Sequence, residues 1–177
     1  MTLRDVAGDV MRRQEPARAH EQVWAERSKL VRTDRLTGLN NQLGWDEALD
    51  EAMFSAARFG GPLVVARIDL DQSAGEDLRS STFPVTAFAS RARRAVRNAD
   101  IFARLDGHAL VVALSRCPRP VAASILERIR TSVGDGETCS VGWAVWDRHE
   151  PAESLMARAQ QALTLALDAG GNQVIAA

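Results

Sequence analysis

A tight turn between two apolar runs constrains this chain more than any other feature of its sequence. The runs are residues 101–104 and 109–114, and Asp106-Gly107 stands between them. An Asp-Gly pair accepts the positive φ angles of a two-residue hairpin turn, and apolar runs of this length suit buried strands. We therefore predict an antiparallel β-hairpin in the second half of the chain.

Helical and strand-like segments surround this hairpin. Three further apolar runs predict strands, at residues 63–68, 139–146 and 173–176. Four amphipathic segments predict helices, at about residues 45–58, 85–96, 121–133 and 152–169. This order predicts a mixed α/β (α+β) domain over residues 34–177.

The first 33 residues are expected to form a separate helical stalk or linker. Pro16 suits the first turn of a helix that ends near Thr33. Val23-Trp24 recurs seven residues later as Leu30-Val31, so both pairs lie on one helix stripe. The stripe indicates either a homodimer through the N-terminal helix or packing of this helix onto the domain, and the sequence leaves both open.

Composition excludes several functional classes. A formal net charge of −1 provides no basic field for DNA or RNA. No run approaches the ~18 consecutive apolar residues of a membrane span, and the first residues lack the apolar core of a signal peptide. We expect a cytoplasmic protein without a membrane span. Cys117 and Cys139 lack metal-ligand spacing and are expected to be reduced thiols.

A series of short motifs follows the chain in a set order. They are DRLTGLNN at 34–41, IDLD at 68–71, RNAD at 97–100, the hairpin at 106–110, SVGWA at 140–144, and a closing helix with AQQAL at 159–163 before GGN at 170–172. Together they resemble the GGDEF domains of the diguanylate cyclase family, in order, over about residues 30–177. The resemblance implies a ferredoxin-like palm sheet, as in nucleotide cyclases, with helices around it.

The resemblance also implies a chemistry. Active members of the family work as dimers and condense two GTP molecules into cyclic di-GMP. In that phosphoryl transfer, carboxylates hold Mg²⁺ and basic side chains hold the triphosphate. The question is then which of these groups the chain carries.

Most of the catalytic positions that the resemblance implies have changed. The signature pentapeptide reads DGHAL, so His108 replaces the metal-binding acid and Ala109 the glutamate after it. Mg²⁺ prefers oxygen ligands to imidazole. The phosphate-contacting lysine and arginine of the last helix align with Leu167 and Gly171. Of the metal acids only Asp69 remains, as a residual candidate.

Positions for base recognition have changed as well. The family's Phe-Lys after IDLD is Ser73-Ala74, its guanine-contacting asparagine is Asp77, and its later Gly-Asp is Ser81-Thr82. Losing one preorganised charge contact typically costs about two to three orders of magnitude in rate. We therefore predict a degenerate domain without catalytic residues, in which Mg²⁺ binds only if some nucleotide binding remains.

Three carboxylates leave two interpretations open. Asp69, Asp71 and Asp106 form either a rearranged acidic pocket for a metal or a set of solvated groups at a strand end and a turn. The second interpretation is favoured.

One binding feature of the family is retained. Arg97 and Asp100 form an RxxD pair at the spacing of the family's inhibitory site for cyclic di-GMP, and Arg128 falls near a further arginine of that site. Guanidinium groups bind phosphate and guanine in bidentate fashion, and a carboxylate accepts from guanine N–H groups. The resemblance thus implies an inactive signalling domain that binds cyclic di-GMP and relays it to a protein partner.

Two alternatives remain. In the first alternative, the domain acts without nucleotide as a dimerisation or protein-interaction module. A solvent-facing tryptophan would support this interpretation. Trp143 and Trp146 are three apart on a predicted strand, so they are expected to face opposite sides of the sheet. In the other alternative, a residual diguanylate cyclase activity depends on Asp69.

Overall fold

The computed structural model describes residues 31–71, 85–134 and 136–177, and residues Thr33–Ala177 form one compact unit. The predicted stalk lies almost wholly outside the described residues, as do Ser73-Ala74, Asp77 and Ser81-Thr82. The predicted helix does not reach Thr33, because residues 31–32 have no helical structure and Thr33 pairs with Asn40 in an antiparallel bridge. That part of the prediction is wrong.

Helices and strands alternate along the described chain, close to the predicted ranges. The described helices are α2 (Gln42–Phe59), α3 (Val85–Arg94), α4 (Arg119–Thr131) and α5 (Ala152–Asp168). The strands are β1 (Leu63–Leu70), β2 (Ile101–Asp106), β3 (Ala109–Ser115), β4 (Cys139–Val145) and β5 (Val174–Ala176). Helix α2 begins earlier than predicted because the Asn41 side chain caps it, accepting a 3.0 Å hydrogen bond from the Gly44 amide. None of the described helices is both long and apolar enough to cross a membrane.

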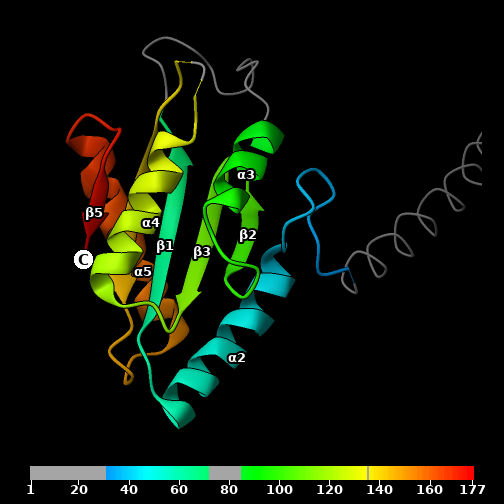
Figure 1. Cartoon of the computed structure of the whole chain (residues 1–177), viewed down its shortest axis with the longest axis vertical. Coiled ribbons are helices and arrows are strands. Elements are labelled where there is room, and N and C mark those ends of the chain that lie inside the picture. The colour runs from blue at the N-terminus through cyan, green and yellow to red at the C-terminus, as the bar shows by residue number, and fades with distance from the viewer. Residues whose placement is uncertain (1–30, 72–84, 135) are drawn as a thin grey trace, which may run out of the picture. The chain divides into compact units, whose positions relative to one another are not determined.

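The strands form one sheet in the order β2-β3-β1-β4-β5 (Figure 1). All neighbours are antiparallel except β4 and β5. The elements follow the order β1-α3-β2-β3-α4-β4, which is the arrangement of a ferredoxin-like fold, and this confirms the predicted palm sheet. The predicted hairpin is β2 and β3, and Gly107 takes a φ of +45° in its turn.

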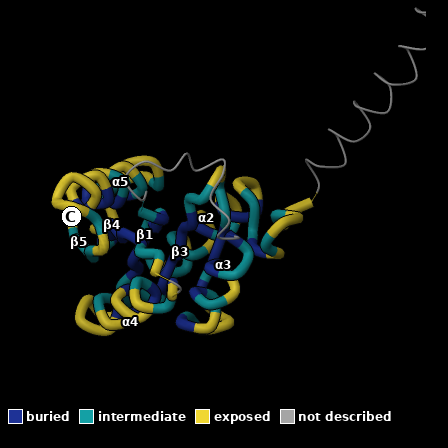
Figure 2. Tube along the Cα trace, turned by 90° about the horizontal axis from the view of Figure 1, so that it is seen from above, coloured by how far each residue is buried: buried dark blue, intermediate teal, exposed yellow. Residues whose placement is uncertain are grey.

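Helices cover both faces of the sheet, and Figure 2 shows the sheet between the two layers. One core cluster joins β1 to α3 and α4 and contains Phe88 and Leu126; the other joins β1 to α2 and α5 and contains Trp45 and Leu155. Strand β1 supplies side chains to both clusters in alternation, as the period of a strand requires.

The two tryptophans of the predicted strand are both buried. Trp143 belongs to the core cluster under α3 and α4, and Trp146 to the cluster under α2 and α5, so they face opposite sides as predicted. Their exposures are 4% and 9%. A helical layer covers each face of the sheet, so neither tryptophan faces solvent and the pair gives the interaction module no support.

Gly142 sets the distance between β4 and α5. A Cβ atom at this residue would lie 1.9 Å from the Leu163 amide nitrogen and 2.4 Å from the Ala159 carbonyl oxygen. Such distances are far below van der Waals contact, so the backbone of α5 lies directly on a strand residue without a side chain. This explains the glycine in the SVGWA motif.

Candidate functional site

A pocket of about 370 Å³ opens at the end of β1. Residues from β1 and from the C-terminal end of α5 line it: Asp69, Leu70, Asp71, Leu167, Gly170 and Gly171. The structure therefore brings together the residual metal candidate and two of the positions that the resemblance gives to catalysis. No lysine or arginine is among these lining residues.

Asp71 ties three segments together beside this pocket. Its carboxylate accepts hydrogen bonds from the hydroxyls of Thr138 and Ser140, each at 2.6 Å, and from the Asn172 amide at 2.7 Å. The end of β1, the start of β4 and the turn before β5 thus meet on one side chain. The interpretation of a merely solvated carboxylate is wrong for Asp71, because two hydroxyls and an amide converge on it.

Gly171 lies directly against the same carboxylate. The Asp71 carboxyl atoms are 2.9–3.1 Å from the place of a Cβ at residue 171, and Gly171 has a φ of +74°. Any side chain here therefore meets both a strained backbone and an occupied space. The position that the resemblance gives to a phosphate-binding arginine has no room for one in this arrangement.

Asp69 is the other carboxylate of the pocket. Burial raises its pKa above the usual value, and the nearby His108 offsets part of this effect. His108 Nδ1 is buried without a hydrogen-bond partner among the described residues. Asp106, in the hairpin turn, is exposed as expected for a solvated turn carboxylate.

These residues do not fit a Mg²⁺ ion. Mg²⁺ requires near-octahedral oxygen coordination, whereas the Asp71 oxygens are engaged by three donors. Within the described ranges, no three His, Cys, Asp or Glu side chains are grouped so that they could hold a metal ion. The position of the second metal acid is His108, whose imidazole suits softer metals.

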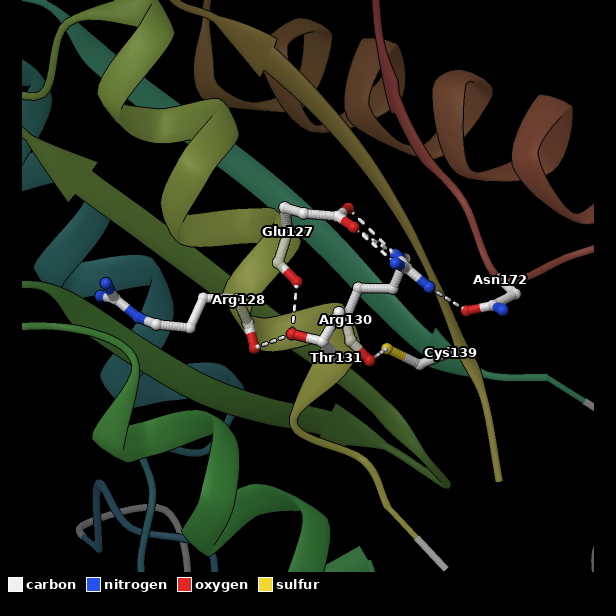
Figure 3. Close-up of polar contacts among 6 residues, drawn as sticks. All are labelled: Glu127, Arg128, Arg130, Thr131, Cys139 and Asn172. Atoms are coloured by element: carbon white, nitrogen blue, oxygen red, sulfur yellow. Dashed lines mark hydrogen bonds and ion pairs between the residues drawn. The ribbon is translucent and has the colours of Figure 1, made fainter. Parts of the chain in front are cut away.

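Arg130 of α4 is a basic side chain that interacts electrostatically with Asp71. It pairs with Glu127 and donates to the side chain of Asn172, and hydrogen bonding to Glu127 raises the pKa of Arg130. Figure 3 shows Arg130 directed toward Asn172, while Arg128 extends from α4 in the opposite direction. The buried Cys139 thiol contacts the Arg130 carbonyl at 3.8 Å. Arg130 is thus held within a network of the fold.

The predicted RxxD residues meet at the turn between α3 and β2. Asp100 is buried, and its carboxylate accepts a 2.8 Å hydrogen bond from the Arg97 amide, while its own amide donates to the Arg97 carbonyl. Arg128 reaches across from α4 and donates to the Ala95 carbonyl at the end of α3. The structure therefore places Arg97, Asp100 and Arg128 around one turn.

The Arg97 side chain itself points to solvent. It is exposed, and its guanidinium makes no hydrogen bond or ion pair with any residue that the structure describes. Its backbone is fixed from two sides, because Arg93 Nη1 donates to its carbonyl at 2.8 Å and Asp100 accepts from its amide. A charged group is thus presented on a rigid turn.

One contact of the site region was not predicted from the sequence. Arg104 Nη1 lies 2.9 Å from Asp34 Oδ2, and Arg104 Nε and Nη2 donate to the Gly107 carbonyl at 2.9 and 2.7 Å. Asp34 also accepts from the amide and hydroxyl of Thr37. The opening motif is thereby joined to the hairpin turn. The available signal was that Asp34 opens the DRLTGLNN motif and that Arg104 stands two residues before the hairpin motif at 106–110.

The sheet order and the pocket at the end of β1 are those of a cyclase-like domain, and the sequence comparison decides the family. The family described as "Diguanylate cyclase, GGDEF domain" matches residues 85–173, half of the chain. This chain belongs to the GGDEF family. The predicted resemblance is therefore confirmed.

Individual relatives agree with this assignment of a GGDEF domain. The diguanylate cyclase DgcP of Pseudomonas aeruginosa is 30% identical over an alignment of 169 residues that covers 88% of this chain. The chain spans only 25% of the length of DgcP.

Solved structures share the fold of this domain. The coiled coil and GGDEF domain of DgcB from Caulobacter crescentus, in complex with c-di-GMP, is 27% identical, with a TM-score of 0.74 and 100% of both chains covered. The diguanylate cyclase SiaD of Pseudomonas aeruginosa, solved with its activator SiaC, has a TM-score of 0.75 at 23% identity and shows the fold alone; 99% of this chain and 73% of SiaD are covered.

Proposed function

We propose that this GGDEF domain is a receptor for cyclic di-GMP that does not synthesise it and that relays binding to a protein partner. The observation that carries this proposal is the exposed Arg97 guanidinium, which has no partner among the described residues and stands on a turn fixed by Asp100. Because the backbone of the turn is already fixed, binding of a phosphate or guanine edge has to order only the Arg97 side chain.

Arg128 extends the proposed site. Its contact with the Ala95 carbonyl brings a second guanidinium to the end of α3, two residues from Arg97. Cyclic di-GMP carries two phosphates and two guanines, so paired arginines match its charge and its acceptor edges. The similar DgcB domain was solved in complex with c-di-GMP, which supports the same ligand class here.

The pocket at the end of β1 supports the absence of synthesis. It is lined by two aspartates, two leucines and two glycines, so a triphosphate would meet carboxylates where cations are needed. Catalysis of phosphoryl transfer depends on cations that neutralise the developing charge. We therefore expect no turnover of GTP.

Calorimetric titration of cyclic di-GMP into the full chain tests the receptor. We expect micromolar or tighter binding that weakens at least tenfold in Arg97→Ala. Arg94→Ala is the matched control, since Arg94 is also an exposed arginine of the same region and lies three residues earlier. Absence of binding, or equal binding by wild type and Arg97→Ala, contradicts the proposal.

A parallel assay with GTP and Mg²⁺ tests the other part of the proposal, that the domain does not synthesise cyclic di-GMP. We expect no cyclic di-GMP to form by chromatography after prolonged incubation. Turnover that disappears in Asp69→Asn would instead establish the alternative of a residual cyclase.

A nucleotide-independent interaction module is favoured by one observation. Phe54 and Phe59 on α2 are 66% and 68% exposed, which is unusual for large aromatic side chains. This alternative expects homodimers, through the N-terminal helix or this surface, whose mass by light scattering is unchanged by cyclic di-GMP. Dissociation in Phe54→Ser with Phe59→Ser would favour it.

A further inference from the structure

We propose that the groove between α2 and α5 binds a small zwitterion of the amino-acid class with an apolar body. The groove has a volume of about 440 Å³, within the range of roughly 300–1,000 Å³ usual for small-molecule sites. It lies apart from both sites described above, since it shares no lining residue with the pocket at the end of β1 or with the turn of Arg97.

Arg67 of β1 is the one basic side chain among the residues that line this groove. It stands in a strand whose preceding residues on the same face, Leu63 and Val65, are fully packed core residues. Its Nε is buried and has no hydrogen-bond partner within the described residues. Buried polar atoms are nearly always satisfied in folded proteins, so a buried Nε without a partner at the edge of a cavity points to a missing acceptor.

Neighbouring carboxylates do not satisfy this guanidinium. Asp69, two residues along the same face of β1, interacts with Arg67 electrostatically but forms no ion pair with it. Asp46, Asp50 and Glu153 line the groove as exposed residues, and none of them pairs with Arg67. The acceptor that suits a guanidinium best is a planar carboxylate, which binds it in bidentate fashion.

The other residues that line the groove indicate which further chemical groups the ligand carries. Trp45, Leu49, Leu105 and Met156 provide apolar walls, which suit an aromatic or aliphatic body. The three exposed carboxylates exceed the single cation, so a simple anion is repelled while an ammonium group is attracted. The ligand that matches the groove therefore has three parts: a carboxylate that binds Arg67, an apolar body that packs against the walls, and an ammonium group near Asp50.

Titration with L-tryptophan and two analogues of single charge tests this. We expect L-tryptophan to bind the full chain at one site, and N-acetyl-L-tryptophan, which lacks the ammonium, and tryptamine, which lacks the carboxylate, to bind at least tenfold more weakly. L-leucine provides a second zwitterion with a smaller body. Lack of binding by both amino acids at millimolar concentration overturns the proposal.

Two variants locate the site. Arg67→Met is expected to weaken binding of the amino acids at least tenfold while removing an unsatisfied polar atom from the fold. Asp50→Asn, at an exposed residue, is expected to weaken L-tryptophan and tryptamine but leave N-acetyl-L-tryptophan unchanged. Arg94→Ala is the matched control. Binding that neither Arg67→Met nor Asp50→Asn alters places the ligand elsewhere and overturns the proposal.

Discussion

The carboxylate of Asp71 occupies the space where a side chain at residue 171 would begin, at 2.9–3.1 Å from the Cβ position. The same carboxylate accepts from Thr138, Ser140 and the Asn172 amide. The end of the sheet and the end of α5 are therefore closed by one acidic residue at a place where the family resemblance implies an arginine.

Gly171→Ala is expected to destabilise the domain by forcing Asp71 out of its hydrogen bonds. The matched control is Gly136→Ala, because Gly136 also has a positive φ, +85°, but has nothing within 4 Å of its Cβ position. Both variants bear the backbone strain, and only the first disturbs the partly buried hydrogen bonds of Asp71, each of which contributes about 0.5–1.5 kcal/mol. Urea unfolding measures the free energy of unfolding of both variants. An equal loss of stability in the two would show that Asp71 moves aside without cost and would contradict the prediction. Gly171→Arg is likewise expected not to restore turnover of GTP.

Asp34→Asn is expected to lower stability near neutral pH. Partial burial raises the pKa of Asp34, but hydrogen bonds from Thr37 and the Arg104 guanidinium outweigh it and hold the pKa below its ordinary 3.8. The ionised form is therefore favoured by folding, and its contribution is full above pH 3.8 and disappears as pH falls through the lower folded-state pKa. Denaturant unfolding of wild type and variant between about pH 2.5 and about pH 7 measures the difference in their free energies of unfolding. Glu51→Gln, at an exposed residue of α2, is the control, and a gap that persists in acid would contradict the assignment.

Asp69→Asn is expected to act in the opposite direction and raise stability at neutral pH. Burial raises the folded-state pKa of Asp69 above 3.8, so ionisation favours the unfolded chain. The gain in the variant should be full above the folded-state pKa and vanish as pH falls to about 3.8. Thermal unfolding at several pH values checks this. A variant less stable than wild type at neutral pH would show that the charge is used in the fold.

Both cysteines are expected to resist thiol reagents in the native protein. Cys117 and Cys139 are 3% and 0% exposed. Burial raises the pKa of both thiols, that of Cys139 to about 12, so very little thiolate is present at neutral pH. Reaction with an aromatic disulfide reagent at pH 8 should follow unfolding, with both thiols becoming reactive together in urea. Rapid reaction of one thiol without denaturant would contradict this.

The sequence predicted the sheet and the helices well because their signals are local. The apolar run of β1, the Asp-Gly turn and the family motifs each act over a few residues. The opposite orientation of Trp143 and Trp146 follows from the period of a strand, whereas their burial depends on helices that are distant along the chain. The extension of the predicted N-terminal helix to Thr33 was wrong for a similar reason, as Thr33 is held by a partner seven residues later.

The candidate sites were predictable in part. Alignment with family motifs identified Asp69, Leu167 and Gly171, and the structure gathers them in one pocket. The role of Asp71 depends on hydroxyls from residues 138 and 140, nearly seventy positions away, so no local pattern indicates it. Arg67 had a weak signal, because it is the one charged residue inside an otherwise apolar run at 63–68.

The packing of α5 directly on Gly142 also affects which residues of this domain can change during evolution. Among the described residues, the positions at which the resemblance implies a changed contact lie in the hairpin turn, at the start of β3 and at the end of α5. A methyl group at residue 142 would instead collide with the backbone of α5 and lift the helix from the sheet. Descendants of this chain are therefore free to lose every ancestral ligand contact while keeping this glycine. A search for distant relatives that have lost the signature pentapeptide is best anchored there.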